Sequence, residues 1–315
     1  MHKKFIIFAL FIVASTSVGG YAWLNYLPIE KLSILDKIPQ KHISNGLGQM
    51  SKHKVLICGI TRDNDAELPS VIKHIEYTGS QFKDYRVVLF ENDSKDNTKK
   101  ILKDWQISNS KVHVITKDFA NIKRPSLGFL ATARNFYIDK VMNDPQYKDF
   151  DIMMVVDMDM VYGWDIRGVA DSFAKIDKWD AVCSNGIYTA DGVMYDLSVY
   201  RAPDFPYNIS SRNDCKAKLG AVTCNRVYPV GSKLVPVDSC FGGMAFYKKS
   251  FISGCTYASI DKDCEHVPFH TCLKEKNNGH MYMNPSQVIR YTHYSPYSWS
   301  DIPTVIRIVN KYYKE

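Results

Sequence analysis

The sequence lacks several patterns that mark common classes of protein. Its 40 lysine and arginine residues are scattered without a long basic run. Proteins that bind nucleic acids usually concentrate such residues on one helix or stripe, so we expect no nucleic-acid partner. The eight cysteines include no close Cys-x-x-Cys pair, which argues against a structural zinc site. No internal repeat or low-complexity tract stands out. The 315 residues, 45% of them hydrophobic, are instead enough for one large α/β domain.

Charge is also missing near the N-terminus, where no charged residue occurs between Lys4 and Glu30. The apolar run 5–13 is short and is followed by small residues, as in a cleaved signal peptide. The uncharged stretch continues to Leu24, about the length that a membrane span needs. We expect a signal anchor or signal peptide over residues 1–27. An anchored chain would be a single-pass type II membrane protein with its body in the Golgi or ER lumen or the cell envelope, and a cleaved chain would be secreted.

Eight cysteines fit an oxidising compartment. Cys58 and Cys183 lie in apolar, strand-like runs, so we expect them to be buried thiols. The other six are candidates for disulfides whose pairing the sequence does not decide: Cys215, Cys224, Cys240, Cys255, Cys264 and Cys272.

Apolar strand-like runs alternate with helical patterns through the first two thirds of the chain. Strands are predicted at 55–60, 86–90, 112–115, 153–156 and 181–183, and helices at 67–77, 98–105, 128–142 and 165–176. This alternation predicts an α/β fold with a mostly parallel central sheet flanked by helices. After about residue 185, Tyr, Pro, Gly, Asn and Cys become frequent, which indicates a mixed, cysteine-rich C-terminal half with long loops.

Two acids, Asp157 and Asp159, directly follow the apolar run 153–156. A buried parallel strand tolerates such residues only beyond its end, in the crevice where open α/β sheets bind ligands. Two carboxylates there suit a divalent cation that also binds phosphates. The alternative is an ordinary acidic turn.

Segment 90–98 resembles the acid-acid-Gly-Ser-x-Asp-Asn-Thr signature of family 2 glycosyltransferases and their relatives with the nucleotide-diphospho-sugar (GT-A) fold, and more distantly capsule-type mannosyltransferases. Glu91 falls on the first acid, which contacts the nucleoside in that family. Asn92 and Asp93 replace the usual second acid and glycine. Segment 128–135 matches a second motif of the family, a glycine followed by Ala-Arg-Asn on a helix.

The resemblance implies a role for each matched residue. Arg134 would lie beside the donor diphosphate, because arginine can bind phosphate through two parallel hydrogen bonds. Asp157 would contact the ribose or the metal, and Asp159 would ligate Mn²⁺ or Mg²⁺. The full set of predicted donor-binding residues is Arg62, Glu91, Asn92, Arg134, Asn135, Asp157, Gly242 and Gly243.

The C-terminal half offers candidates for catalysis and acceptor binding. Glu265 takes the position of the family's general base, with Asp263 as the second candidate. Asn185 and His270 are possible acceptor contacts, and a zinc pair that includes His270 would lack further ligands nearby. His293 is the predicted third metal ligand, with His280 and His270 as alternatives.

These expectations divide the chain into a stem or linker (28–52), a glycosyltransferase domain (53–300) with a nucleotide-binding half (53–165) and an acceptor-side half (166–300), and a tail (301–315). The implied activity is metal-dependent transfer of a sugar from a UDP- or GDP-linked donor to a hydroxyl of a glycan, glycolipid or glycoprotein. A nucleotidyltransferase would need a Gly-rich loop after the first strand, which 59–64 lacks. A non-enzymatic, disulfide-rich carbohydrate-binding protein is a further alternative.

Overall fold

The computed structural model describes residues 33–119, 126–188, 192–259 and 263–291. They form one eight-stranded sheet in the order β3-β2-β1-β4-β7-β5-β8-β6. The strands are β1 (Lys54–Thr61), β2 (Asp84–Glu91), β3 (Val112–Thr116), β4 (Ile152–Val156), β5 (Ala181–Tyr188), β6 (Val235–Pro236), β7 (Met244–Lys248) and β8 (Met281–Tyr291).

The first four strands pair in parallel, with Thr61 at the end of β1 opposite Glu91 at the end of β2. β7 is antiparallel to both of its neighbours, β4 and β5. β5 and β8 are parallel, and β6 completes the sheet as a short antiparallel edge strand. The predicted fold class is confirmed: the sheet is mostly parallel in the first half and mixed in the second.

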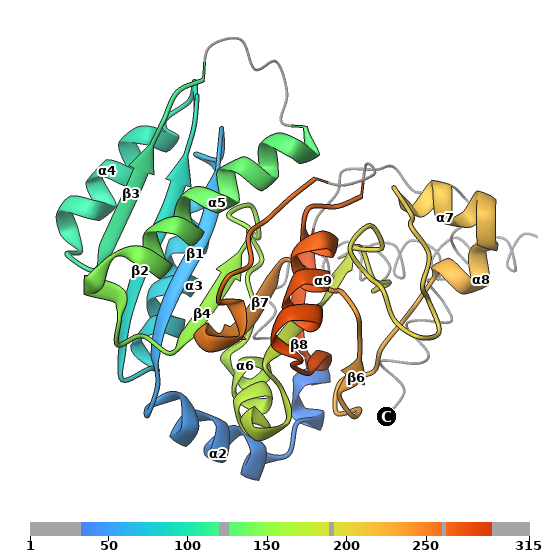
Figure 1. Ribbon diagram of the computed structural model, residues 1–315. Helices are drawn as coiled ribbons and strands as arrows, with labels where there is room; N and C mark the ends of the chain where they lie inside the picture. The colour runs from blue at the N-terminus through green and yellow to red at the C-terminus, as the bar shows by residue number, and fades with distance from the viewer. Residues whose placement is uncertain (1–32, 120–125, 189–191, 260–262, 292–315) are drawn as a thin grey trace, which may run out of the picture.

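Helices cover both faces of the sheet (Figure 1). They are α2 (Gln40–Met50), α3 (Leu68–Ser80), α4 (Thr98–Ser108), α5 (Leu127–Asn143), α6 (Ile166–Phe173), α7 (Arg212–Leu219), α8 (Ala221–Cys224) and α9 (His266–Asn277), with 3₁₀ turns η2 (Ser33–Lys37), η3 (Pro145–Tyr147), η4 (Ile176–Lys178) and η5 (Lys249–Ile252). Alternate residues of β1 enter different cores: Ile57 packs with α2, α3, α4 and α6, whereas Leu56 packs with α5 and α9. The period-2 geometry of a strand therefore supplies apolar side chains to both layers.

Residues 28–52, expected as a stem or linker, include a helix that packs on the body. Ile43 and Met50 of α2 are buried in the core that also contains α6. Gly46 permits the close approach, because a Cβ there would lie 1.8 Å from the carbonyl oxygen of Ala170. The few apolar residues of this polar segment are thus enough for α2 to pack against α6.

The cysteines pair as Cys183–Cys240, Cys215–Cys224 and Cys255–Cys272. The expectation that Cys183 is a buried thiol was therefore wrong, and Cys264 is free instead. The error arose because Cys183 lies in an apolar strand, while its partner belongs to a distant segment that the fold brings alongside. Cys58 is a buried thiol, as expected.

The prediction of a single-pass type II membrane protein is not supported and is withdrawn. Within the described ranges, no helix combines the length and apolar character needed to cross a bilayer. Residues 1–27 and the tail 301–315, for which an anchor and a terminal segment were predicted, lie outside the described residues.

Candidate active site

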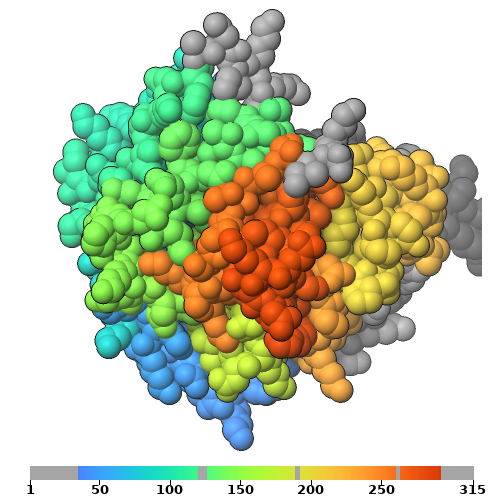
Figure 2. Space-filling view, viewed as in Figure 1, coloured from blue at the N-terminus to red at the C-terminus, as the bar shows by residue number. Residues whose placement is uncertain are grey.

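An acidic pocket of about 300 Å³ lies near the C-terminal end of β4. Its lining comes from α5, from the segment 195–210 and from the residues just before and at the start of α9, which are the green, yellow and orange-red segments that meet on the face shown in Figure 2. The lining residues are Leu127, Leu130, Arg134, Asp157, Tyr195, Asp196, Ser198, Asn208, Ile209, Ser210, Phe241, Asp263, Cys264, Glu265 and His266. We call this set the acidic pocket.

Arg134 contacts two other predicted residues at this pocket. It projects from α5, and its side chain is 6% exposed. Its Nε donates to Oε1 of Glu265 at 2.9 Å, and its Nη2 lies 3.5 Å from Oδ1 of Asp157. Its Nη1 is buried and has no hydrogen-bond partner among the described residues. Two carboxylates therefore fix the guanidinium, and its Nη1 can still donate a hydrogen bond. An arginine in this state can bind an anion without changing its position.

The protein disfavours the charged form of both Asp157 and Asp159. Burial raises the pKa of Asp157 to about 8, against the opposing effect of Arg134. Burial also raises the pKa of Asp159. Carboxylate oxygens at one strand end, each destabilised as an anion, have the donor chemistry that suits Mg²⁺ or Mn²⁺.

The predicted third metal ligand, His293, lies outside the described residues. Across the ranges that the structure describes, no cluster of three or more His, Cys, Asp or Glu side chains could hold a metal ion. Asp157 and Asp159 supply carboxylate oxygens, the ligand type that Mg²⁺ and Mn²⁺ prefer, and they stay the predicted metal ligands.

The glycine pair predicted to approach a ligand lies directly beside Asp157. The carbonyl oxygen of Gly243 accepts a hydrogen bond from the Asp157 amide at 2.9 Å. Both glycines have positive φ, 64° at Gly242 and 84° at Gly243. A Cβ at Gly242 would lie 2.2 Å from the carbonyl oxygen of Ser184, so glycine is required there for packing as well as for conformation.

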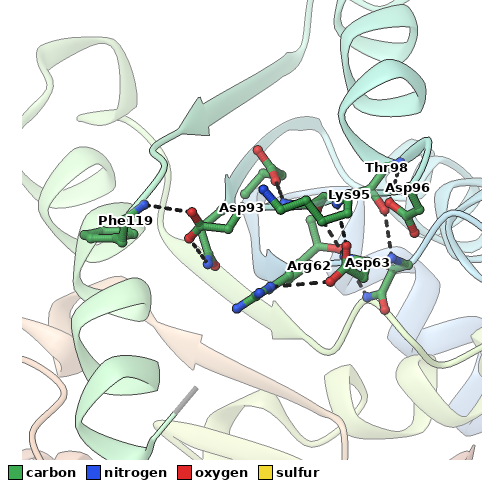
Figure 3. A network of polar contacts seen from close by, with 12 residues as sticks. Arg62, Asp63, Asp93, Lys95, Asp96, Thr98 and Phe119 are labelled. Carbon is green, nitrogen blue, oxygen red and sulfur yellow. Dashed lines mark hydrogen bonds and ion pairs between the residues drawn. The ribbon is translucent and has the colours of Figure 1, made fainter. Parts of the chain in front are cut away.

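The loops after β1 and β2 form a second polar region (Figure 3), and none of their residues lines the acidic pocket. Asp63 Oδ1 accepts from the Lys95 amide at 2.7 Å, and Ser94 Oγ accepts from the Asp63 amide at 3.0 Å. Asp93 has φ 53°, the left-handed conformation for which the related motif uses glycine. Its carboxylate is held by the Phe119 amide at 2.9 Å.

Three predicted donor-binding residues belong to this second region. Glu91 is fully buried at the end of β2; its Oε1 accepts from the Ser94 amide at 3.0 Å, and its Oε2 has no partner within the described part of the chain. Arg62 likewise has a buried Nη1 with no partner there. Asn92 donates to Asp93 at 2.8 Å. Glu91 Oε2, an acceptor, and Arg62 Nη1, a donor, lie on adjacent loops and could both hydrogen-bond to a polar ligand.

Three other predicted residues, Asn135, Asn185 and His270, make hydrogen bonds within the protein. Asn135 donates to the carbonyl of Tyr257 and accepts from its amide, both at 2.8 Å. Asn185 is buried at 2% exposure; its Nδ2 donates to the carbonyls of Tyr228 and Pro285, and its Oδ1 is buried with no partner among the described residues. Neither residue lines the acidic pocket.

His270 is also engaged internally. Its Nδ1 is 2.8 Å from Ser239 Oγ, and its Nε2 is 2.9 Å from Tyr247 Oη. It is fully buried, and burial lowers its pKa to about 3. A predicted acceptor contact is thus a neutral core histidine that spans two hydroxyl groups.

Sequence reasoning missed Asp196, which lines the acidic pocket. Its Oδ2 accepts from the Gly242 amide at 2.9 Å, and its Oδ1 accepts from Ser198 Oγ at 3.2 Å. The available signal was a single acid in the mostly apolar segment Val193–Val199, which contains no other charged residue.

No family model and no curated protein matches the sequence. Solved structures resemble the fold at low identity. TarS 1–349 of S. aureus, solved also with UDP and with UDP-GlcNAc, is 14% identical, with a TM-score of 0.45 over 82% of this chain and 65% of that one. The chain therefore spans slightly less than two thirds of that fragment, and 39% of the longer TarS structure.

Two further structures are similar. The mannosyltransferase PcManGT of Pyrobaculum calidifontis, in complex with GDP-Man and Mn²⁺, is 11% identical, with a TM-score of 0.43 over 89% of this chain and 74% of that one. GalNAc-T7 with UDP, GalNAc and Mn²⁺ is 13% identical, with a TM-score of 0.46 over 82% of this chain and 48% of that one. The chain is thus similar in its course to glycosyltransferase structures, at identities between 11% and 14%.

Proposed function

We propose that the protein is a metal-dependent glycosyltransferase that moves a sugar from a nucleoside-diphosphate sugar to an acceptor hydroxyl. One observation carries the proposal: Arg134, held by Asp157 and Glu265, presents an unused buried Nη1 beside an acidic pocket at the end of β4. A cation and an arginine at one strand end are what a leaving diphosphate requires.

The donor is expected to extend along the edge of the sheet where β1, β2 and β4 end. Asp157 and Asp159 would hold Mn²⁺ or Mg²⁺, which neutralises charge on the leaving diphosphate. Arg134 would bind the same diphosphate, because its Nη1 is the donor that the fold leaves unpaired. The unused oxygen of Glu91 and the unused Nη1 of Arg62 would bind the nucleoside, in a UDP- or GDP-linked donor.

The acidic pocket would take the acceptor. A volume of about 300 Å³ is at the lower limit for a small-molecule site and suits one sugar unit. Ser198, Asn208 and Ser210 offer hydrogen bonds to hydroxyl groups, and Phe241 offers an apolar face. These features favour a glycan, glycolipid or glycoprotein as acceptor. The three disulfides are typical of proteins made for an oxidising compartment, which suits such acceptors.

Calorimetry of the full chain with UDP and with GDP tests the proposal, each titration being run with MnCl₂ and with EDTA. We expect at least one nucleotide to bind, and to bind at least about tenfold more weakly in EDTA, because the cation links two carboxylates to the diphosphate. Asp104→Asn, an exposed change on α4, is the matched control and should bind normally. Binding of neither nucleotide would refute the proposal.

A further inference from the structure

Three of the four carboxylates that line the acidic pocket have an arginine partner. Asp157 and Glu265 share Arg134, and Asp263 accepts from Arg201 Nη2 at 2.6 Å. A guanidinium that hydrogen-bonds a carboxylate occupies an oxygen that could otherwise accept a hydrogen bond from a bound hydroxyl. Glu265 and Asp263, the two residues expected to act as base, are therefore both held in ion pairs.

Asp196 is the fourth carboxylate, and it forms no ion pair within the described ranges. Its contacts are the Gly242 amide at one oxygen and Ser198 Oγ at the other. A carboxylate oxygen can accept more than one hydrogen bond, so each of these oxygens can still accept another from a bound hydroxyl. Gly242 belongs to the loop that also holds the Asp157 backbone through Gly243, so the fold fixes Asp196 relative to the proposed cation site.

The environment of Asp196 also suits proton transfer. Burial raises the pKa of Asp196 to about 6, although the Gly242 hydrogen bond opposes the shift. A general base works best when its pKa is near the working pH. The raised pKa agrees with the contacts of Asp196, which include no ion pair among the described residues.

On the basis of the proposed function, we propose that Asp196 is the general base of the transfer reaction. The acceptor oxygen forms a bond to the anomeric carbon while the bond from that carbon to the diphosphate oxygen breaks. The electron pair of the broken bond leaves with the diphosphate, and the acceptor hydroxyl's proton passes to the Asp196 carboxylate. Glu265 then serves as a positioning residue that aligns Arg134, and Asp263 as one that aligns Arg201.

Donor hydrolysis tests this assignment without an identified acceptor, because water then occupies the acceptor's place and loses the proton. The full chain is incubated with UDP-GlcNAc and with GDP-mannose in MnCl₂, and release of UDP or GDP is measured. Asp196→Asn keeps the shape and removes the base, so hydrolysis should fall by at least about 10²-fold. Calorimetry with UDP or GDP and MnCl₂ should give a dissociation constant within about threefold of the unmodified chain.

Three comparisons make the result decisive. Formate should partly restore hydrolysis to Asp196→Ala, because a small carboxylate can enter the space left beside the pocket. Glu265→Gln should retain more hydrolysis than Asp196→Asn, and Asp104→Asn should retain all of it. Hydrolysis by Asp196→Asn within tenfold of the unmodified chain, or a reversed order of the Glu265 and Asp196 variants, would overturn the assignment. A lack of nucleotide binding by the unmodified chain would refute the proposed function itself.

Discussion

Arg134 is a buried cation whose position depends on two acids from distant parts of the chain. Segment 128–135 predicted a functional arginine on a helix, and the structure places it between Asp157 and Glu265. The sequence could not show that Glu265 would be its partner, because 131 residues separate them. It also could not show that His270 faces the core, since a helical histidine can lie on either face.

The geometry of Arg134 gives a first prediction. Arg134→Lys keeps the charge but loses the planar group that reaches Glu265 and a phosphate at once. We expect nucleotide affinity to fall at least about tenfold in calorimetry with MnCl₂. Unchanged affinity, with the fold intact by circular dichroism, would contradict the role given to the guanidinium.

Asp159 gives a second prediction. Because burial disfavours its charge, Asp159→Asn should raise the melting temperature of the metal-free protein by a few degrees. The same change should remove most of the gain in nucleotide affinity that MnCl₂ provides. Differential scanning calorimetry and titration measure the two effects, and a variant that is less stable yet still metal-dependent would contradict this role.

Elements were predicted best where the sequence is rich in apolar residues. The strand predicted at 86–90 extends over Asp84–Glu91, and the helix predicted at 128–142 over Leu127–Asn143. β5, predicted over 181–183, continues to Tyr188 because β8 pairs with it along that length. α2 was missed since its sequence is polar and its docking depends on α6, which only the folded chain brings near.

Asp171 on α6 holds this contact together and gives a third prediction. Burial alone would raise its pKa, but hydrogen bonds from Lys175, His42 and Asn284 outweigh burial and lower it. A lowered pKa means that the charged form adds stability above about pH 4 and that this stability is lost as the pH falls further. Asp171→Asn should cost about 1–3 kcal/mol at pH 7 and less at pH 3, measured by urea unfolding. An equal cost at both pH values would contradict the ionic contribution.

The disulfides give a fourth prediction, which compares a long closed loop with a short one. Cys183–Cys240 spans 57 residues and joins β5 to the segment before Gly242, whereas Cys215–Cys224 spans 9. In the chain-entropy account the longer loop stabilises more, by about 1–2 kcal/mol. Serine pairs at the two sites, compared by urea unfolding, should show the larger loss at Cys183–Cys240; the reverse order would contradict this account.

At the scale of the whole molecule, parallel strands explain why the sequence could predict that residues from distant segments lie together. β1, β2 and β4 run in one direction, so the residues that follow them meet at one edge of the sheet. The acceptor side was less predictable, because β7 enters the sheet in the opposite direction and its loop fixes Asp196 through a backbone amide. Neither the direction of β7 nor the hydrogen bond between Gly242 and Asp196 follows from a periodic pattern in the sequence.

In the proposed function, a cation held by the acids after β4 joins the protein to a nucleotide diphosphate beside Arg134. A crystal grown with MnCl₂ and the nucleotide that binds in calorimetry, with anomalous data for manganese, tests it most directly. The account predicts a manganese peak between the carboxylate of Asp159 and the diphosphate, with a phosphate oxygen bonded to Arg134. A nucleotide bound elsewhere, or a diphosphate at Arg134 with no manganese at Asp159, would contradict it.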